Sequence, residues 1–338
     1  MGQRQLRVQA YSHALVFKDD WAITARMGTA NTTLRREFAF LALAGTIWGL
    51  QPLLVKFLVH DIPPSCLSAA RFFLVALTVF GIMRSRRMRM FPPLACVLPL
   101  LCMGICGISV NNIAQFSGLL YSTVGNATLI ASTTPVLTAL LAALLLRERL
   151  LPLQWLGIFV ALGGVLFLVT RGALGIILSL SFNYGDVLFF ISQLAWAAYT
   201  LIGYRVMKKM EPLAVTGWSG LFGASTTLAY ALWAGEVHVV SISAPKVLCF
   251  AYIVWLGGVA ATLFWNRGVS HVGPGQTVVF MYIMPVVGVA AGVIFLGEPF
   301  FWQECLGALA IFSGVGLMAL TRTRMHHKVL PNKGRLRH

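Results

Sequence analysis

Residues 134–165 read TPVLTALLAALLLRERLLPLQWLGIFVALGGV, and residues 284–315 read MPVVGVAAGVIFLGEPFFWQECLGALAIFSGV, so one skeleton recurs after 150 positions. Over the wider pair 118–169 and 268–319, ten of 52 positions are identical without a gap. The identities fall mostly on Gly, Pro and Glu, whereas chance matching of an apolar chain would favour Leu and Ala. Because a period of this length is too long for a solenoid, we interpret it as a duplicated domain.

The composition places this duplicated chain in a membrane. Its 338 residues are 58% hydrophobic and only 11% charged, and its mean hydropathy is +0.80, whereas soluble domains carry about 25% charged residues. The formal net charge of +16 comes from basic residues that lie between apolar runs. They form no basic patch interleaved with aromatic residues, so we expect the lipid bilayer as a partner and no nucleic acid.

Ten apolar runs have the length of about 20 residues that a transmembrane helix needs. We expect these helices at 38–58, 64–83, 93–116, 122–146, 151–170, 186–206, 212–234, 247–266, 273–296 and 300–320. With the N-terminus in the cytoplasm, 22 of the 26 Lys and Arg residues fall in cytoplasmic segments or at inner span ends, and only Arg171 and Lys246 fall in outer loops. The positive-inside rule therefore favours ten helices with both termini in the cytoplasm.

The number of spans in each half, which is five, determines how the two halves are oriented in the membrane. An odd number makes the second half cross the membrane in the opposite sense, an arrangement common in secondary transporters. The sequence thus predicts an all-α membrane protein with ten transmembrane helices in two inverted five-helix repeats. The expected parts are a cytoplasmic N-terminal segment 1–36, a first repeat 37–170, a second repeat 186–320 and a basic cytoplasmic tail 321–338. Residues 1–26 could be an extension, because Met27 begins a more ordinary approach to the first span.

Two prolines and two glutamates occupy matching places in the two halves. Pro135 and Pro285 lie within the fourth and ninth spans, where a proline kinks a helix. The kinks could open backbone carbonyls toward a central site or could only shape the packing of helices. Glu148 and Glu298 lie at the ends of the same two helices, and we expect each to cap the next helix or to pair with nearby arginine residues.

Lys56 and Arg71 are the only basic residues well inside spans, and an ionisable residue there indicates a function. Lys56 lies near the outer end of its helix, from which its ammonium group can reach water. Arg71 lies about seven residues into the second span, roughly 10 Å deep. It could bond carbonyls at a helix end, or it could attract an anionic group such as a substrate carboxylate.

We expect a substrate site near the middle of the membrane, between the two halves. The candidates are polar and aromatic residues within spans, with Arg71 near the outer mouth: Trp48, Gln51, Asn112, Gln115, Asn126, Trp196, Tyr199 and Tyr282. Trp48 and Trp196 have comparable depths in the opening helices of the two halves, where a tryptophan does not serve as an interface anchor. Packing between helices could explain these side chains as well as the lining of a cavity does.

Motifs of enzymes are absent from the sequence. It contains no HExxH, no Walker loop, no Gly-x-Ser-x-Gly and no CxxC, and none of its seven histidines lies deep in a span. We therefore predict no catalytic site, no metal site and no cofactor. Glu37, Asp186 and Glu304 lie near span ends, so a buried carboxylate relay for protons has little support and facilitated diffusion stays open.

Taken in order, the motifs resemble those of an EamA domain. Trp48-Gly49 with Lys56, and then Arg71-Phe72-Phe73, are similar to its opening. The block from Pro135 through Glu148 to Gly164 continues the resemblance, and its copy runs from Pro285 through Glu298 to Gly314. Gly185-Asp186, with Trp196 and Tyr199 following, resembles the start of the second copy. The resemblance covers about residues 37–320.

The EamA family belongs to the drug/metabolite transporter superfamily, whose members are mostly ten-span proteins of the bacterial inner membrane. The resemblance implies this fold and class, with a central cavity lined by helices from both halves, and it does not identify a substrate. Our main hypothesis is a secondary transporter that exports a small polar or amphipathic, amino-acid-like metabolite by alternating access, and a homodimer is compatible with it. A sensor or scaffold without transport is the alternative, in which the tail 321–338 could bind acidic lipids or a partner. An enzyme that acts on lipids would need His, Cys or carboxylate groups converging at one depth, which the sequence lacks.

Overall fold

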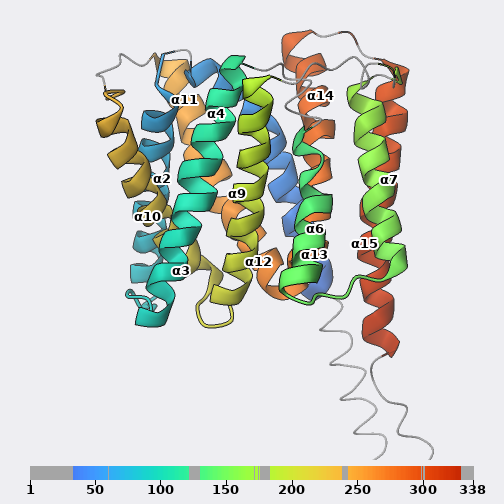
Figure 1. The fold of residues 1–338 in the computed structure, drawn as a ribbon, viewed down its shortest axis with the longest axis horizontal. Coiled ribbons are helices and arrows are strands. Elements are labelled where there is room, and N and C mark those ends of the chain that lie inside the picture. Colours follow the sequence, from blue (N-terminus) through green and yellow to red (C-terminus); the bar gives the residue numbers. More distant parts are fainter. Residues whose placement is uncertain are drawn as a thin grey trace, which may run out of the picture.

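The computed structural model describes residues 33–59, 61–121, 130–170, 172–173, 175, 183–237, 243–297, 299 and 301–328. All regular structure in these residues is helical, and the long helices stand side by side in a bundle about one helix tall (Figure 1). Eight of them are long and apolar enough to cross a membrane. The chain is therefore an all-α membrane protein, as the composition predicts.

Seven helical segments of the first half have both bounds within the described residues. They are the helix Thr33–Val59, α2 (Pro64–Ser85), α3 (Leu94–Gly104), a π-helical segment (Ile105–Val110), α4 (Asn111–Tyr121), α6 (Thr134–Leu145) and α7 (Pro152–Val169). The consecutive segments α3, Ile105–Val110 and α4 form one apolar span, Leu94–Gly118.

Nine helical segments of the second half have both bounds within the described residues. They are α9 (Tyr184–Val206), α10 (Pro212–Trp233), α11 (Ala244–Ala251), a second π-helical segment (Tyr252–Ala261), α12 (Thr262–Val272), α13 (Pro274–Thr277), a 3-10 segment (Val278–Tyr282), α14 (Ile283–Leu296) and α15 (Trp302–Lys328). Segments α11 to α12 form the span Ala244–Val272, and α13 to α14 form the span Pro274–Phe295.

Two of the ten predicted spans are not among the eight apolar helices. The span predicted at 212–234 corresponds to α10, which has 22 residues but is less apolar because it carries hydroxyl side chains such as Thr216, Ser219 and Thr227. The span predicted at 122–146 is described only in part, by the 12-residue helix α6, because 122–129 lie outside the described residues. The number ten therefore stays a prediction.

Both prolines that we expected within spans stand where the helix geometry changes. Pro135 lies in the first turn of α6, after a turn at 132–133 that separates it from the preceding helical residues. Pro285 is the third residue of α14, directly after the 3-10 segment. Because proline has no N–H and its ring crowds the preceding turn, it is tolerated at these helix starts.

Close helix pairs hold the bundle together. In Figure 1, α2 and α10 lie at the left side of the bundle and α7 and α15 at the right side, and the two helices of each pair are in extensive contact. Gly157 and Gly164 of α7 lie against the backbone of α15, since a Cβ added to either would come within 2.8 Å of the carbonyl oxygen of Gly314 or Gly307, respectively. Such small residues let transmembrane helices approach closely.

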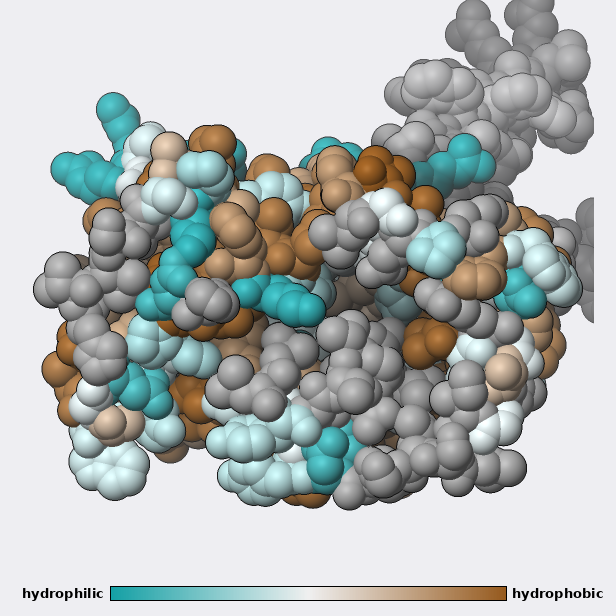
Figure 2. Space-filling model, turned by 90° about the horizontal axis from the view of Figure 1, so that it is seen from above, coloured by the Kyte–Doolittle hydropathy of each residue, from teal (hydrophilic) through white to brown (hydrophobic). Residues whose placement is uncertain are grey.

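The outer surface of the bundle is suited to lipid. Large apolar side chains such as Leu77, Leu144 and Leu248 are 68–74% exposed, which a soluble protein avoids over large areas. Figure 2 looks onto one end of the bundle, where hydrophilic residues gather among hydrophobic ones. Apolar sides and a partly hydrophilic end are the pattern that a bilayer requires.

Candidate functional site

Three indole rings meet in the interior of the bundle, and we call Trp48, Trp196 and Trp265 the tryptophan cluster. They come from the helix Thr33–Val59, α9 and α12, and their ring centroids are 5.5–5.7 Å apart in all three pairs. Tyr199 stacks on Trp196 at 5.0 Å, one helical turn away. The cluster therefore joins the first half of the chain to the second.

The cluster contains hydrogen-bond donors without acceptors. The Nε1–H of Trp48 donates to the carbonyl oxygen of Gly257 at 2.9 Å. The Nε1 atoms of Trp196 and Trp265 are buried and have no partner among the described residues. A buried donor left unpaired costs about 1–3 kcal/mol, so an oxygen acceptor brought in by a ligand or by water would stabilise this region.

A buried arginine lies close to the cluster. Arg71 is 3% exposed, and its Nη2 donates to the Oε1 atom of Gln51 at 2.8 Å. Its Nε has no partner among the described residues. Gly257, the acceptor of the Trp48 bond, lies against both side chains, because an added Cβ would be 2.5 Å from Gln51 Oε1 and 3.3 Å from Arg71 Nη2.

Two polar links fix the helices around the cluster. Asn266 Nδ2 donates to Tyr199 Oη and to Thr216 Oγ1, each at 2.9 Å, and so ties together α9, α10 and α12. Thr134 Oγ1 donates to Gln193 Oε1 at 2.6 Å and ties α6 to α9. These side chains already have partners, which makes them supports of the site and weaker candidates for binding a substrate.

The structure thus brings together five of the sequence-predicted site residues in two connected groups. Trp48, Trp196 and Tyr199 touch through their rings, while Gln51 and Arg71 are joined by their hydrogen bond. Arg71, which we expected near the outer mouth, lies beside Gly257, the residue whose carbonyl binds Trp48.

The other predicted site residues take different places. Asn112 turns back onto its own helix and donates to the Ile108 carbonyl at 2.8 Å, which supports the π-helical segment. Tyr282 is 1% exposed, and its hydroxyl has no partner among the described residues. Gln115 is half-buried, and Asn126 lies outside the described residues.

Trp265 completes the cluster and was missing from the candidates chosen by sequence. A signal for it exists, because Trp265 stands 150 positions after Gln115, which was chosen. Asn266 and Thr216 were also missed. Nothing in the sequence shows that these two side chains meet, since they lie on different helices.

Acidic residues near the ends of the bundle stabilise contacts between helices. Glu37 is 1% exposed and forms an ion pair with Arg267, with Oε1 and Nη2 2.6 Å apart. Glu148, which we expected to cap the next helix or to pair with nearby arginine residues, accepts at its Oε2 from the backbone N–H of Gly275 at 3.0 Å, 127 positions away. Lys246 pairs with Asp61.

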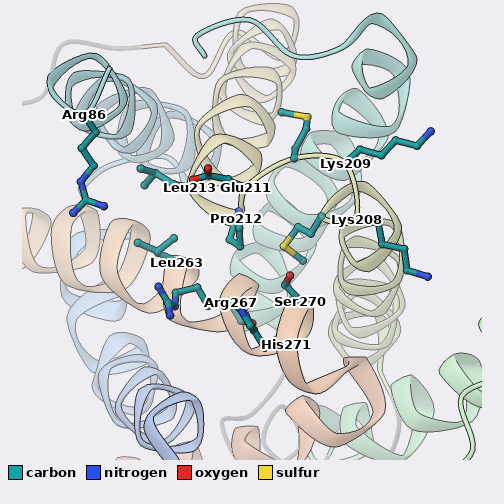
Figure 3. A pocket seen from close by; sticks show the side chains of 12 residues that line it. Arg86, Lys208, Lys209, Glu211, Pro212, Leu213, Leu263, Arg267, Ser270 and His271 are labelled. Carbon is teal, nitrogen blue, oxygen red and sulfur yellow. The ribbon is translucent and has the colours of Figure 1, made fainter. Parts of the chain in front are cut away.

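A cavity of about 540 Å³ opens at one end of the bundle, between α2, α12 and the loop from α9 to α10 (Figure 3). Arg86, Lys208, Lys209 and Arg267 line it together with Glu211. In Figure 3 both lysine side chains point away from its middle. Since this end carries many basic residues, the positive-inside rule predicts that it faces the cytoplasm.

Known proteins are similar to this chain in sequence and in fold. The sequence profile of the EamA-like transporter family matches residues 36–170 and 183–320. An uncharacterized transporter of Bacillus subtilis (strain 168), YyaM, is 30% identical over 270 residues, which cover 78% of this chain and 86% of YyaM. A probable amino-acid metabolite efflux pump of Salmonella typhimurium is 25% identical, with 83% of this chain and 94% of the pump covered.

A solved crystal structure has the same fold, with a TM-score of 0.72 at 20% identity, and the match covers 86% of this chain and 99% of the other. Two matches of one family profile account for most of the sequence, and the described helices are those of a membrane protein. The chain belongs to the EamA-like transporter family and is a multi-pass membrane transporter.

Proposed function

We propose that the protein is a secondary transporter that exports a small amphipathic, amino-acid-like metabolite by alternating access. The observation that carries this proposal is the tryptophan cluster, in which the indole N–H groups of Trp196 and Trp265 have no acceptor among the described residues. Apolar ring faces with a few donors suit a ligand that is partly hydrocarbon and carries oxygen acceptors. The relatives named as amino-acid metabolite efflux pumps agree with such a substrate.

The proposed architecture is ten transmembrane helices in two inverted five-helix repeats, 37–170 and 186–320. Support comes from the contact between α7 and α15. Under the 150-residue shift Gly157 corresponds to Gly307 and Gly164 to Gly314, yet Gly157 touches Gly314 and Gly164 touches Gly307. Such an exchange of partners is what a two-fold axis in the membrane plane produces. The double match of the family profile agrees with it.

In the proposed cycle, one half rocks against the other around the tryptophan cluster. Trp48 belongs to the first half, whereas Trp196 and Trp265 belong to the second, so relative motion of the halves would part the rings and admit a substrate. Asp186 and Glu304 each accept a hydrogen bond from the backbone at the start of their own helix. Because both are engaged in this way, we propose no proton relay through them.

We place the protein in the inner membrane of a bacterium with both termini in the cytoplasm. The distribution of Lys and Arg supports this orientation, and the lipid bilayer and a small molecule are the proposed partners. A protease-sensitive tag at the C-terminus tests the orientation, since we expect cleavage only from the cytoplasmic side. Cleavage only from the outer side would contradict it.

Transport into proteoliposomes tests the function. We expect the purified protein to move at least one compound of an amino-acid and amino-acid-metabolite panel above the rate of empty vesicles. Replacing Trp265→Leu should lower that rate about tenfold or more, because it removes a central ring. The matched change Trp302→Leu, at a position that is 65% exposed, should leave the rate unchanged. No transport of any compound in the panel would sink the proposal.

A further inference from the structure

We infer that the substrate is a hydrophobic carboxylate without an ammonium group, and that Arg71 selects it. This inference rests on the proposed transport function, and it narrows the amino-acid-like class to organic acids that lack a basic nitrogen. It begins from an uncompensated charge in the interior of the bundle, because the buried guanidinium of Arg71 forms no ion pair with the described residues.

Arg71 is a permanent cation that has no counter-ion among the described residues. An arginine side chain keeps its proton under all ordinary conditions. The guanidinium is buried, its described hydrogen-bond acceptor is the neutral amide of Gln51, and its Nε lacks an acceptor. Its guanidinium carbon lies 4.9 Å from the ring centroid of Phe72. A buried charge without a partner is strongly unfavourable, and a substrate carboxylate would supply the partner.

None of the described acidic residues pairs with Arg71, and Glu236, which bonds α2, does so at Ser65, six residues before Arg71. The sequence has ten acidic residues, and none lies in the middle of a span: Asp19, Asp20, Glu37, Asp61, Glu148, Asp186, Glu211, Glu236, Glu298 and Glu304. Of these, Asp19, Asp20 and Glu298 lie outside the described residues. The faces of the tryptophan rings attract cations, but the nearby guanidinium repels them. A zwitterion would therefore have one charge satisfied and the other opposed.

The arginine and the ring cluster can act on one molecule because they flank the same backbone position. Trp48 and Gln51 are three residues apart and so share a face of their helix. Trp48 donates to the Gly257 carbonyl, and Gly257 also lies against Gln51 and Arg71. A carboxylate that displaces Gln51 could bind Arg71 in a bidentate manner, while the hydrocarbon part of the substrate lies on the indole rings.

This substrate class also provides a driving force. A monoanion that leaves a negatively charged cytoplasm moves down the electrical gradient, and 100 mV supports a concentration ratio of about 50-fold. Export would then need no carboxylate relay, in agreement with the positions of the acidic residues at the ends of spans. We therefore expect transport to carry net negative charge.

Three probes of nearly equal size test the inference in proteoliposomes: phenyllactate, phenylalanine and phenyllactamide. They differ in whether they carry a carboxylate alone, a carboxylate with an ammonium group, or neither charge. We expect wild-type protein to transport phenyllactate about tenfold or more faster than phenylalanine. A potassium diffusion potential set with valinomycin should change the phenyllactate flux and leave the phenyllactamide flux unaffected.

Variants assign the selection to Arg71. Arg71→Gln should abolish the preference for phenyllactate over phenyllactamide, and Arg71→Lys should restore part of it. Lys56→Gln, which removes the other cation within a span at an exposed position, should leave the preference unchanged. Elution as a single species and retained phenyllactamide transport will show that Arg71→Gln is folded. If Arg71→Gln does not fold, Arg71→Lys alone tests the role of Arg71. A preference for phenyllactate over phenyllactamide that is smaller than in wild type supports that role, and an unchanged preference contradicts it.

The possible outcomes separate this inference from the proposed function. Transport of phenylalanine at a rate equal to or above that of phenyllactate would overturn the inference and leave the transport function in place. A wild-type preference that persists unchanged in Arg71→Gln would overturn the role of Arg71. Transport of other panel compounds but none of the three probes would also overturn the inference. If nothing in the panel is transported, the proposed function itself fails.

Discussion

Two contacts link helices of the first half of the chain to helices of the second, and they match in position but differ in chemistry. Gly107 lies against Tyr199 of α9, and Gly257 lies against Gln51 of the helix Thr33–Val59. The two glycines are 150 positions apart, the two side chains are 148 positions apart, and both glycines stand in π-helical segments. The two glycines thus occupy matching positions, whereas the side chains that face them differ.

The hydrogen bonding of the two contacts differs as well. Trp48 donates to the Gly257 carbonyl, whereas Trp196, 148 positions later, has no acceptor among the described residues. By the relation between the halves, the counterpart of the Gly257 carbonyl is that of Gly107. We interpret the Trp48–Gly257 contact as closed and the corresponding contact of Trp196 as open. A transporter that opens to one side of the membrane at a time requires such a difference.

Filling the two glycine positions should give the largest effects. In Gly107→Ala the new Cβ would overlap the Tyr199 ring, which is fixed by Asn266, so we expect a loss of about 1–3 kcal/mol. In Gly257→Ala the Cβ meets the flexible Gln51 amide, so we expect a smaller loss of stability. Thermal unfolding in detergent measures both. Gly163→Ala, where a Cβ meets nothing within 4 Å, is the control.

Removing the indole nitrogens tests whether the two tryptophans differ as described. Trp48→Phe should cost about 1 kcal/mol more than Trp196→Phe, because only Trp48 loses a hydrogen bond that is made. If a bound substrate holds the protein open to the opposite side of the membrane, we expect Trp196→Phe to cost more than Trp48→Phe. Unfolding midpoints with and without substrate measure this. Equal costs in both conditions would refute the open and closed interpretation.

The sequence predicts where the main residues lie along the spans, but it does not predict the contacts that depend on which helices are neighbours. The shared depth of Trp48 and Trp196 follows from their places in apolar runs, which is why both were found. That Glu148 reaches Gly275, or that Thr216 meets Asn266, depends on which helices are neighbours. Hydropathy does not reveal which helices are neighbours, because the hydropathy of a span is the same whichever helix it packs against.

The same reasoning explains why candidate site residues of one chemical type were hard to rank. Asn112 and Gln51 are both amides within spans, yet Asn112 bonds its own helix and Gln51 bonds Arg71. The direction in which an amide points is set by the local π-helical geometry and by neighbours. The difference therefore emerges only in the folded bundle, whereas the isolated charge of Arg71 is visible in the sequence.

The tyrosine hydroxyls offer a comparison of intermediate size. Tyr199 is 2% exposed and bonds Asn266, while Tyr252 is half-buried and donates to the Ile47 carbonyl at 3.1 Å. Tyr199→Phe should cost about 1–1.5 kcal/mol, because it removes a partner from a buried amide. Tyr252→Phe should cost less, since the Ile47 carbonyl lies within a helix and keeps its backbone hydrogen bond. A larger cost for Tyr252→Phe in thermal unfolding would contradict this order.

The smallest single effect is expected at Thr262, whose Oγ1 lies 3.3 Å from the same Gly257 carbonyl that Trp48 binds. Thr262→Val should cost at most about 0.5 kcal/mol, because Trp48 still donates to that oxygen. In Trp48→Phe/Thr262→Val both side-chain donors are gone, so the double variant should lose about 0.5–1 kcal/mol more than the sum of the single variants. A double-mutant cycle by thermal unfolding measures this coupling. Additive costs would mean that backbone N–H groups alone satisfy the carbonyl, and the contact between Trp48 and Gly257 would then have no special role in closing this side of the bundle.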